Sequence, residues 1–256
     1  MSVFRSLVIA FSLYSKIPMP HMEWRDEDMR WVMIFFPLIG VVIGIVMCLW
    51  QRICIAIGIG NMARSLILAA IPVIITGGFH VDGFMDTMDA LHSYAPRERK
   101  LEILKDSHVG AFAVIMAVLW STIYIAGLSE IGSVDVCITL SGGFVVSRIL
   151  SALAVIRWPK ANADGNVEFM ARTSESKIVI IILLAELIIM ALFLLGRGFG
   201  AIAVIIGAAG SYAYYYYKCR KEFGGTSGDL AGWFVVICEV SITVLMAVFV
   251  NIMRIL

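Results

Sequence analysis

Long apolar runs alternate with short polar segments along most of the chain, a pattern typical of a protein that crosses a membrane several times. The runs that we expect to span lie at residues 31–51, 64–80, 110–128, 134–156, 178–195, 199–217 and 230–253. An apolar run at 3–14 ends at Pro18-Met-Pro20 and is too short to span comfortably, so it predicts an interfacial or re-entrant helix. No small-residue cleavage site follows it, which argues against a removable signal peptide.

The predicted fold class is therefore all-α, a polytopic membrane helical bundle of about seven transmembrane helices plus this short N-terminal helix. We find no long linker, repeat or low-complexity tail, so a single integral-membrane domain is expected over residues 1–256. Composition agrees with a lipid-bilayer protein, since 61% of residues are hydrophobic, 15% are charged and the mean hydropathy is +0.93. The net charge of +1 gives no sign of a nucleic-acid partner, and none is expected.

The five cysteines contain no C-x-x-C pair, and most lie in apolar runs, which favours small buried or lipid-facing side chains over zinc ligands or disulfides.

Basic residues are distributed very unevenly among the loops. Alternate loops, beginning with the N-terminus, hold 15 of the 20, the opposite loops hold Arg52, Arg64, Arg197 and Arg254, and Arg148 lies inside a span. The positive-inside rule then places the N-terminus in the cytoplasm of a cell-membrane protein.

An acidic stretch follows the apolar run 64–80 directly, with Asp82, Asp86 and Asp89 at positions i, i+4 and i+7. On a helix these three carboxylates fall within roughly 60° of arc, where they repel one another unless a cation lies between them. A hard divalent cation, Mg²⁺ above all, fits oxygen ligands of this kind. The alternative is a solvated acidic helix end. By the charge rule the stretch faces the cytoplasm.

Three further charges lie at similar depth inside the predicted spans. Arg148 is about 12 Å from the cytoplasmic end of its span, and Glu186 and Glu239 lie level with it in two other spans. Intramembrane charges usually face a partner or a wet cavity. We expect Arg148 to point inward, with Glu239 as its preferred partner and Glu186 as the second choice. A snorkelling arginine and protonated acids are the alternatives.

A glycine-rich turn at 224–229 precedes the last span. Asp229 at its end either caps the following helix or belongs to a turn whose backbone N–H groups bind a phosphate. Together with the acidic stretch, such a turn indicates group transfer between phosphate-bearing substrates, with a metal that screens a pyrophosphate and an aspartate that accepts a proton.

The stretch from Thr76 to Asp89, followed by Lys105-Asp106-Ser107-x-x-Gly110, resembles the cobalamin (5′-phosphate) synthase family, also called adenosylcobinamide-GDP ribazoletransferases. Other matching stretches follow in order along nearly the whole chain. They are Lys16-Ile-Pro18-Met-Pro20, Phe36-Pro37-Leu38-Ile39-Gly40, Ser147-Arg148, Gly165-Asn166 and Gly224-Gly225-x-x-Gly228-Asp229 with the later Glu239. Ala90, His108 and Val236 depart from the family's usual glycine, arginine and acidic residue.

The resemblance implies a Mg²⁺-dependent membrane enzyme that joins adenosylcobinamide-GDP to α-ribazole, or to its 5′-phosphate, with release of GMP. Asp82, Asp86 and Asp89 would hold metal, and Asp106 would be a further ligand or the base. Lys105 would contact a phosphate. Substrate and phosphate contacts would come from His80, Arg148, Gly224, Gly225, Thr226, Gly228 and Asp229. Whether the chain forms a homo-oligomer stays open.

Three other classes of protein share parts of this pattern. A CDP-alcohol phosphotransferase also begins its motif with Asp-Gly, but it requires Ala-Arg three residues later, where this chain has Met85-Asp86. A membrane prenyltransferase would show two separated aspartate-rich motifs instead of one. A cation- or proton-coupled transporter would more naturally place its acids at the bilayer midplane than at one face.

Overall fold

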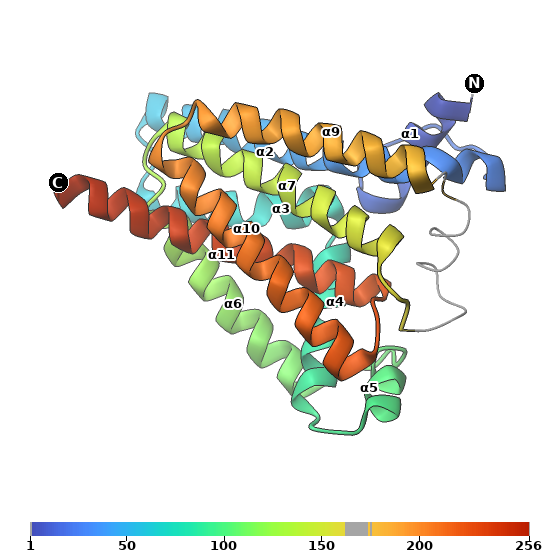
Figure 1. Ribbon diagram of the computed structural model, residues 1–256. Helices are drawn as coiled ribbons and strands as arrows, with labels where there is room; N and C mark the ends of the chain where they lie inside the picture. The colour runs from blue at the N-terminus through green and yellow to red at the C-terminus, as the bar shows by residue number, and fades with distance from the viewer. Residues whose placement is uncertain (1, 162–173, 175, 256) are drawn as a thin grey trace.

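The protein is a bundle of helices in a computed structural model that describes residues 2–161, 174 and 176–255 (Figure 1). Apart from an isolated bridge between Lys160 and Thr226, the elements in these residues are all helical. They are α1 (Ser2–Tyr14), η1 (Asp26–Trp31), α2 (Val32–Ile57), α3 (Asn61–Thr76), α4 (Phe79–His92), α5 (Arg97–Ile103), α6 (Ala111–Ser129), α7 (Val134–Arg157), α9 (Ser176–Leu195), α10 (Phe199–Lys218), η2 (Cys219–Phe223) and α11 (Gly228–Ile255).

Six described helical segments are each long and apolar enough to cross a membrane, namely η1 with α2, α6, α7, α9, α10 with η2, and α11. The α3–α4 pair brings the number to seven if it counts as one span. The predicted helical membrane bundle is therefore confirmed, and the short N-terminal helix is present as α1. The stretch Gly165-Asn166 lies outside the described residues.

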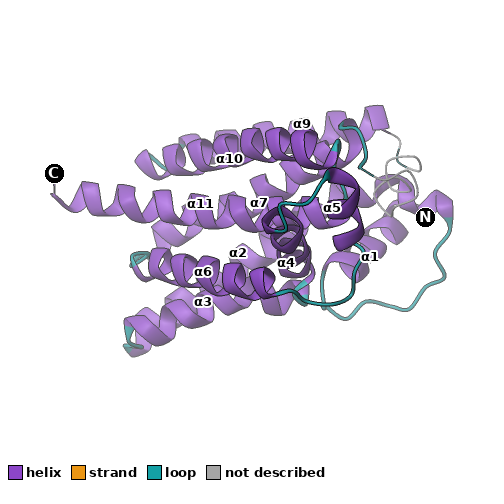
Figure 2. Cartoon of the chain, turned by 90° about the horizontal axis from the view of Figure 1, so that it is seen from below, coloured by secondary structure: helices purple, strands orange, loops and turns teal. Residues whose placement is uncertain are grey.

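The second predicted span, 64–80, ends earlier than expected, at Thr76, and the acidic stretch forms a separate helix. The chain bends by 96° between α3 and α4, and α4 is seen nearly end-on among the lengthwise helices in Figure 2. The bend is made by Gly77 and Gly78, whose φ angles of +65° and +81° are ones that residues with a Cβ rarely adopt. Two adjacent left-handed residues end α3 and turn α4 out of its direction, so α4 lies outside the six spans.

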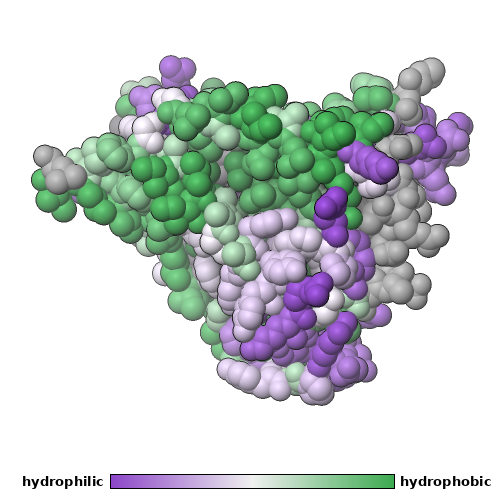
Figure 3. All heavy atoms as spheres, viewed as in Figure 1, coloured by the Kyte–Doolittle hydropathy of each residue, from purple (hydrophilic) through white to green (hydrophobic). Residues whose placement is uncertain are grey.

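The core of the bundle is built around α11, which packs against α4, α6, α7 and α10. Trp233 and Phe234 of α11 and Phe144 of α7 are each almost completely buried. α9, in contrast, is largely exposed, and its surface is apolar, as expected for a helix in contact with lipid. In Figure 3 apolar residues cover the long helices, whereas polar residues gather at the end of the molecule that carries α5.

Candidate active site

The acidic stretch forms α4, and this helix is held against the first turn of α11 by a close backbone approach. A Cβ atom at Gly83 would lie 2.8 Å from both the Cα and the carbonyl oxygen of Asp229. Because only glycine leaves room here, α4 and α11 bring their carboxylates to the same place. The contact makes Asp229 a neighbour of Asp82 and Asp86, although it lies far from both in the sequence.

These three aspartates, which we call the acid group, carry mutually repelling charges. Burial, together with the negative charges of Asp82, Asp229 and Asp89, raises the pKa of the half-buried Asp86 to about 6. In the described part of the chain no hydrogen bond or ion pair neutralises the side chain of Asp82 or Asp86. A cluster of carboxylates without a basic partner is suited to a cation.

Asp89 has a different environment from the other two aspartates of α4. Its Oδ2 accepts a hydrogen bond from the N–H of Gly110 at 2.6 Å, and its Oδ1 accepts one from the N–H of Ala113 at 2.9 Å. These are unpaired donors at the N-terminus of α6, so Asp89 caps that helix from a distance. A metal-binding role for Asp89 stays a prediction, and both of its oxygens are already engaged in this geometry.

The loop that carries Lys105 and Asp106 is exposed. Asp106 Oδ1 accepts a hydrogen bond from the N–H of His108 at 3.0 Å and lies 2.7 Å from His108 Nδ1. These bonds lower the pKa of Asp106 below its usual value. Within the described residues no hydrogen bond or ion pair connects Asp106 with Asp82 or Asp86, so its role as a ligand or base stays a prediction.

The glycine-rich turn is held by bonds within the protein. The N–H groups of Gly225 and Thr226 donate to the carbonyl oxygens of Cys219 and Pro159. The Thr226 hydroxyl is hydrogen-bonded to that of Tyr215, and the Arg97 guanidinium occupies the space where a Cβ of Gly224 would lie. The phosphate contacts predicted for Gly224, Gly225, Thr226 and Gly228 stay predictions, and Gly228 begins α11.

Of the two alternatives for Asp229, the one in which it caps the last span is wrong. The cap is Ser227, whose hydroxyl accepts a hydrogen bond from the N–H of Leu230 at 3.3 Å. Asp229 lies in the first helical turn instead, where its carboxylate is half-buried beside the acid group's other members.

A cavity of about 150 Å³ adjoins the acid group and reaches it at Asp229. Its lining includes His80, Tyr14, Phe36, Ser151 and Gly228. His80 is only 5% exposed, and neither ring nitrogen has a hydrogen-bond partner among the residues that the structure describes. A buried polar group left unpaired is costly, so His80 is available to bond a ligand in this cavity.

Arg148 points into the bundle and pairs with Glu239, as predicted. Its Nη1 lies 2.6 Å from Glu239 Oε1, and the Ser147 hydroxyl donates to the same carboxylate oxygen at 3.2 Å. Glu186, the second choice, is not its partner, because the hydrogen bonds and ion pair of Arg148 in the described residues go to α7 and α11. Phe36 separates Arg148 from His80, with its ring 5.8 Å from the guanidinium and 5.6 Å from the imidazole.

The residues that the structure describes contain no group of three or more His, Cys, Asp or Glu side chains that could hold a metal ion by themselves. This geometry still fits Mg²⁺, which usually takes only one or two protein carboxylates and fills its octahedral shell with waters and substrate phosphates. Asp82 and Asp86, which no basic side chain among the described residues neutralises, match that pattern, and Asp229 beside them lines the cavity. Asp229 is the member that sequence reasoning had not assigned to the metal, since nothing in the linear order places it beside α4.

A Gly83→Ala substitution is expected to lower activity strongly and to reduce thermal stability, because the new methyl group would force α4 and α11 apart at Asp229. Gly210→Ala in α10 is the matched control, since its Cβ would meet open space and alanine favours a helix. The two variants can be compared by thermal unfolding in detergent. Equal stability and activity of both would contradict the close contact.

Comparison with known proteins gives a uniform result. The family model described as cobalamin-5-phosphate synthase matches residues 6–247. A protein of Lachnoclostridium phytofermentans named adenosylcobinamide-GDP ribazoletransferase is 40% identical over 91% of this chain and 90% of its own length. Proteins of the same name from Clostridium botulinum and Clostridium perfringens are 31% and 32% identical, over 93% and 92% of this chain and 95% and 94% of their own. No solved structure matches.

Proposed function

The chain belongs to the cobalamin-5-phosphate synthase family, and we propose that it joins adenosylcobinamide-GDP to α-ribazole, or to α-ribazole 5′-phosphate, with release of GMP. The names of its relatives support this transferase reaction over a transporter or a CDP-alcohol phosphotransferase. The observation that carries the proposal is the acid group of Asp82, Asp86 and Asp229, unneutralised and beside a cavity.

In the proposed reaction a ribose hydroxyl of α-ribazole attacks the phosphorus that carries the cobinamide side chain. A new P–O bond forms, the bond to the GMP phosphate breaks, and the hydroxyl proton passes to a carboxylate of the acid group. His80, whose ring nitrogens are unbonded, would orient a polar group of the substrate within the cavity.

We also propose that the reaction depends on Mg²⁺. Asp82 and Asp86 would hold the ion, with Asp229 close enough to contribute, and the substrate's pyrophosphate would complete its coordination. The ion, when bound, would offset the negative charge that develops on the leaving GMP. Asp89, Asp106 and Lys105 stay candidates for further metal, base and phosphate contacts.

The site is proposed to face the cytoplasm of a cell membrane. The distribution of basic residues supports this orientation, because the loops on the side of the acid group include Arg97, Arg99, Lys100 and Lys105. Nucleotide substrates made in the cytoplasm would then reach the acid group directly.

The test is GMP release by purified, detergent-solubilised protein. We expect release only when adenosylcobinamide-GDP and α-ribazole are both present, with loss of at least about a hundredfold on chelation by EDTA and recovery on adding Mg²⁺. Release without α-ribazole would indicate a hydrolase and contradict the transfer. Full activity in EDTA would remove Mg²⁺ from the proposal and leave the transfer intact.

A further inference from the structure

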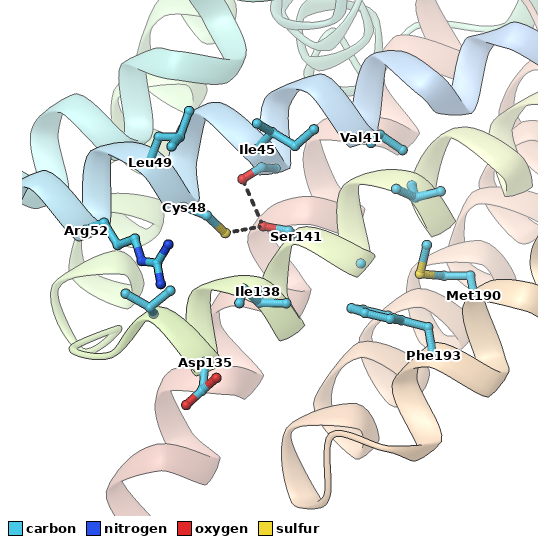
Figure 4. Close-up of a pocket in the computed structure, with 14 residues that line it drawn as sticks. Val41, Ile45, Cys48, Leu49, Arg52, Asp135, Ile138, Ser141, Met190 and Phe193 are labelled. Carbon is cyan, nitrogen blue, oxygen red and sulfur yellow. Dashed lines mark hydrogen bonds between the residues drawn. The ribbon is translucent and has the colours of Figure 1, made fainter.

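A cavity of about 680 Å³ lies away from the acid group, between α2, α7 and α9. Figure 4 shows its labelled side chains on these three helices. We refer to it as the α2–α7–α9 groove. Its α2 wall, Ile45 and Leu49 especially, is open to the surroundings, since both side chains are 54% exposed.

The groove lies toward the membrane face opposite the acid group. The start of α2 contributes Phe36 to the His80 cavity, whereas Arg52 lies near the other end of the helix. Between Val41 and Arg52 the groove follows α2 for about 16 Å at 1.5 Å per residue. This is about half of a hydrocarbon core of roughly 30 Å, the depth of one leaflet.

The interior of the groove offers an occupant almost no polar contact. Its lining is mainly aliphatic and aromatic, with Val145, Met190 and Phe193 among the residues that face α2. The hydroxyl of Ser141 donates to the carbonyl oxygen of Cys137 at 2.7 Å and lies 3.4 Å from Cys48 Sγ. The part of an occupant that lies inside must therefore be apolar.

One end of the groove is charged. Arg52 projects from α2 toward the start of α7, and its side chain takes part in no hydrogen bond or ion pair within the described residues. Asp135 lines the same end, with Arg197 3.9 Å away, so the end carries two guanidinium groups and one carboxylate. It is suited to one anionic group, and an arginine fork matches a phosphate.

We propose that the α2–α7–α9 groove binds one anionic phospholipid, with an acyl chain along the groove and its phosphate on Arg52. The apolar interior is about as long as one leaflet and would hold the acyl chain. The cationic end follows it and would hold the phosphate, as in a phospholipid. A free organic phosphate would fit only the Arg52 end and would leave the apolar interior unfilled.

The test is native mass spectrometry of the full-length protein after reconstitution in equal amounts of phosphatidylglycerol and phosphatidylcholine. We expect one retained phosphatidylglycerol per chain. Arg52→Gln should lower its retention about fivefold, the factor that one arginine contributes near anionic lipid. Ile45→Trp should abolish retention by filling the groove, whereas Ile189→Trp, which is exposed on α9 and does not line the groove, should leave it unchanged.

A measurement on the unmodified chain is independent of how these variants fold. Cys48 lines the groove and is partly exposed, while the other four cysteines are buried. Phosphatidylglycerol should therefore slow alkylation of Cys48 by N-ethylmaleimide, and glycerol 1-phosphate, which has no acyl chain, should not. Equal retention of the two lipids, equal protection by glycerol 1-phosphate, or a dimer that Ile45→Trp dissociates would overturn the proposal.

Discussion

Replacing Asp86 with asparagine is expected to reduce GMP release by about a thousandfold while the protein stays folded in the membrane. Asp86 is half-buried, and this burial and the negative charges of Asp82 and Asp229 already raise its pKa. Asparagine removes one negative charge, which relieves repulsion and preserves stability. It also removes a ligand that the proposed Mg²⁺ needs. Turnover by purified wild-type and variant protein, each matched for thermal stability, measures the effect.

Asp89→Asn is the matched control on the same helix. Its amide oxygen can still accept one hydrogen bond from the N-terminus of α6, so we expect a modest loss of stability and activity within about tenfold of wild type. A folded Asp89→Asn protein as inactive as Asp86→Asn would make Asp89 part of the metal site. Near-normal turnover of Asp86→Asn would remove the acid group from the mechanism.

Breaking the Arg148–Glu239 pair is expected to cost about 3–5 kcal/mol of stability, because either single substitution leaves an uncompensated charge inside the bundle. Arg148 is completely buried and Glu239 is 9% exposed, and their side chains lie 2.6 Å apart. We expect Arg148→Met and Glu239→Gln each to unfold at markedly lower denaturant concentration than wild type. The double variant should be more stable than the sum of the two effects predicts, with a coupling of about 1–3 kcal/mol.

Arg254→Gln is the control for these single and double variants. It breaks a largely exposed ion pair with Glu130, whose atoms lie 3.1 Å apart, and should cost less than about 1 kcal/mol. If the losses of stability in Arg148→Met and Glu239→Gln simply add in the double variant, a direct interaction between the two side chains is contradicted. Single variants no less stable than Arg254→Gln would show that water reaches Arg148.

The general architecture could be predicted from the sequence because a bilayer constrains both length and polarity. Apolar runs of about 20 residues have few alternatives to a spanning helix. The cost of an intramembrane charge likewise predicted that Arg148 faces an acid and not lipid, and its partner proved to be Glu239. The spacing of Asp82 and Asp86 placed both on one helix face without any tertiary information.

What the sequence alone did not determine depends on contacts between segments distant along the chain. The 96° bend at Gly77-Gly78 needs both glycines to be left-handed, and the same dipeptide would equally suit a mobile turn. Only the approach of α11 at Gly83 showed that Asp229 joins the acid group and that Ser227 is the cap. The spacing of Asp89 puts it on the same helix face as Asp82 and Asp86, but its carboxylate accepts hydrogen bonds from the N-terminus of α6. Its hydrogen-bond partners depend on which residues lie near it in space, and the spacing along the helix does not reveal them.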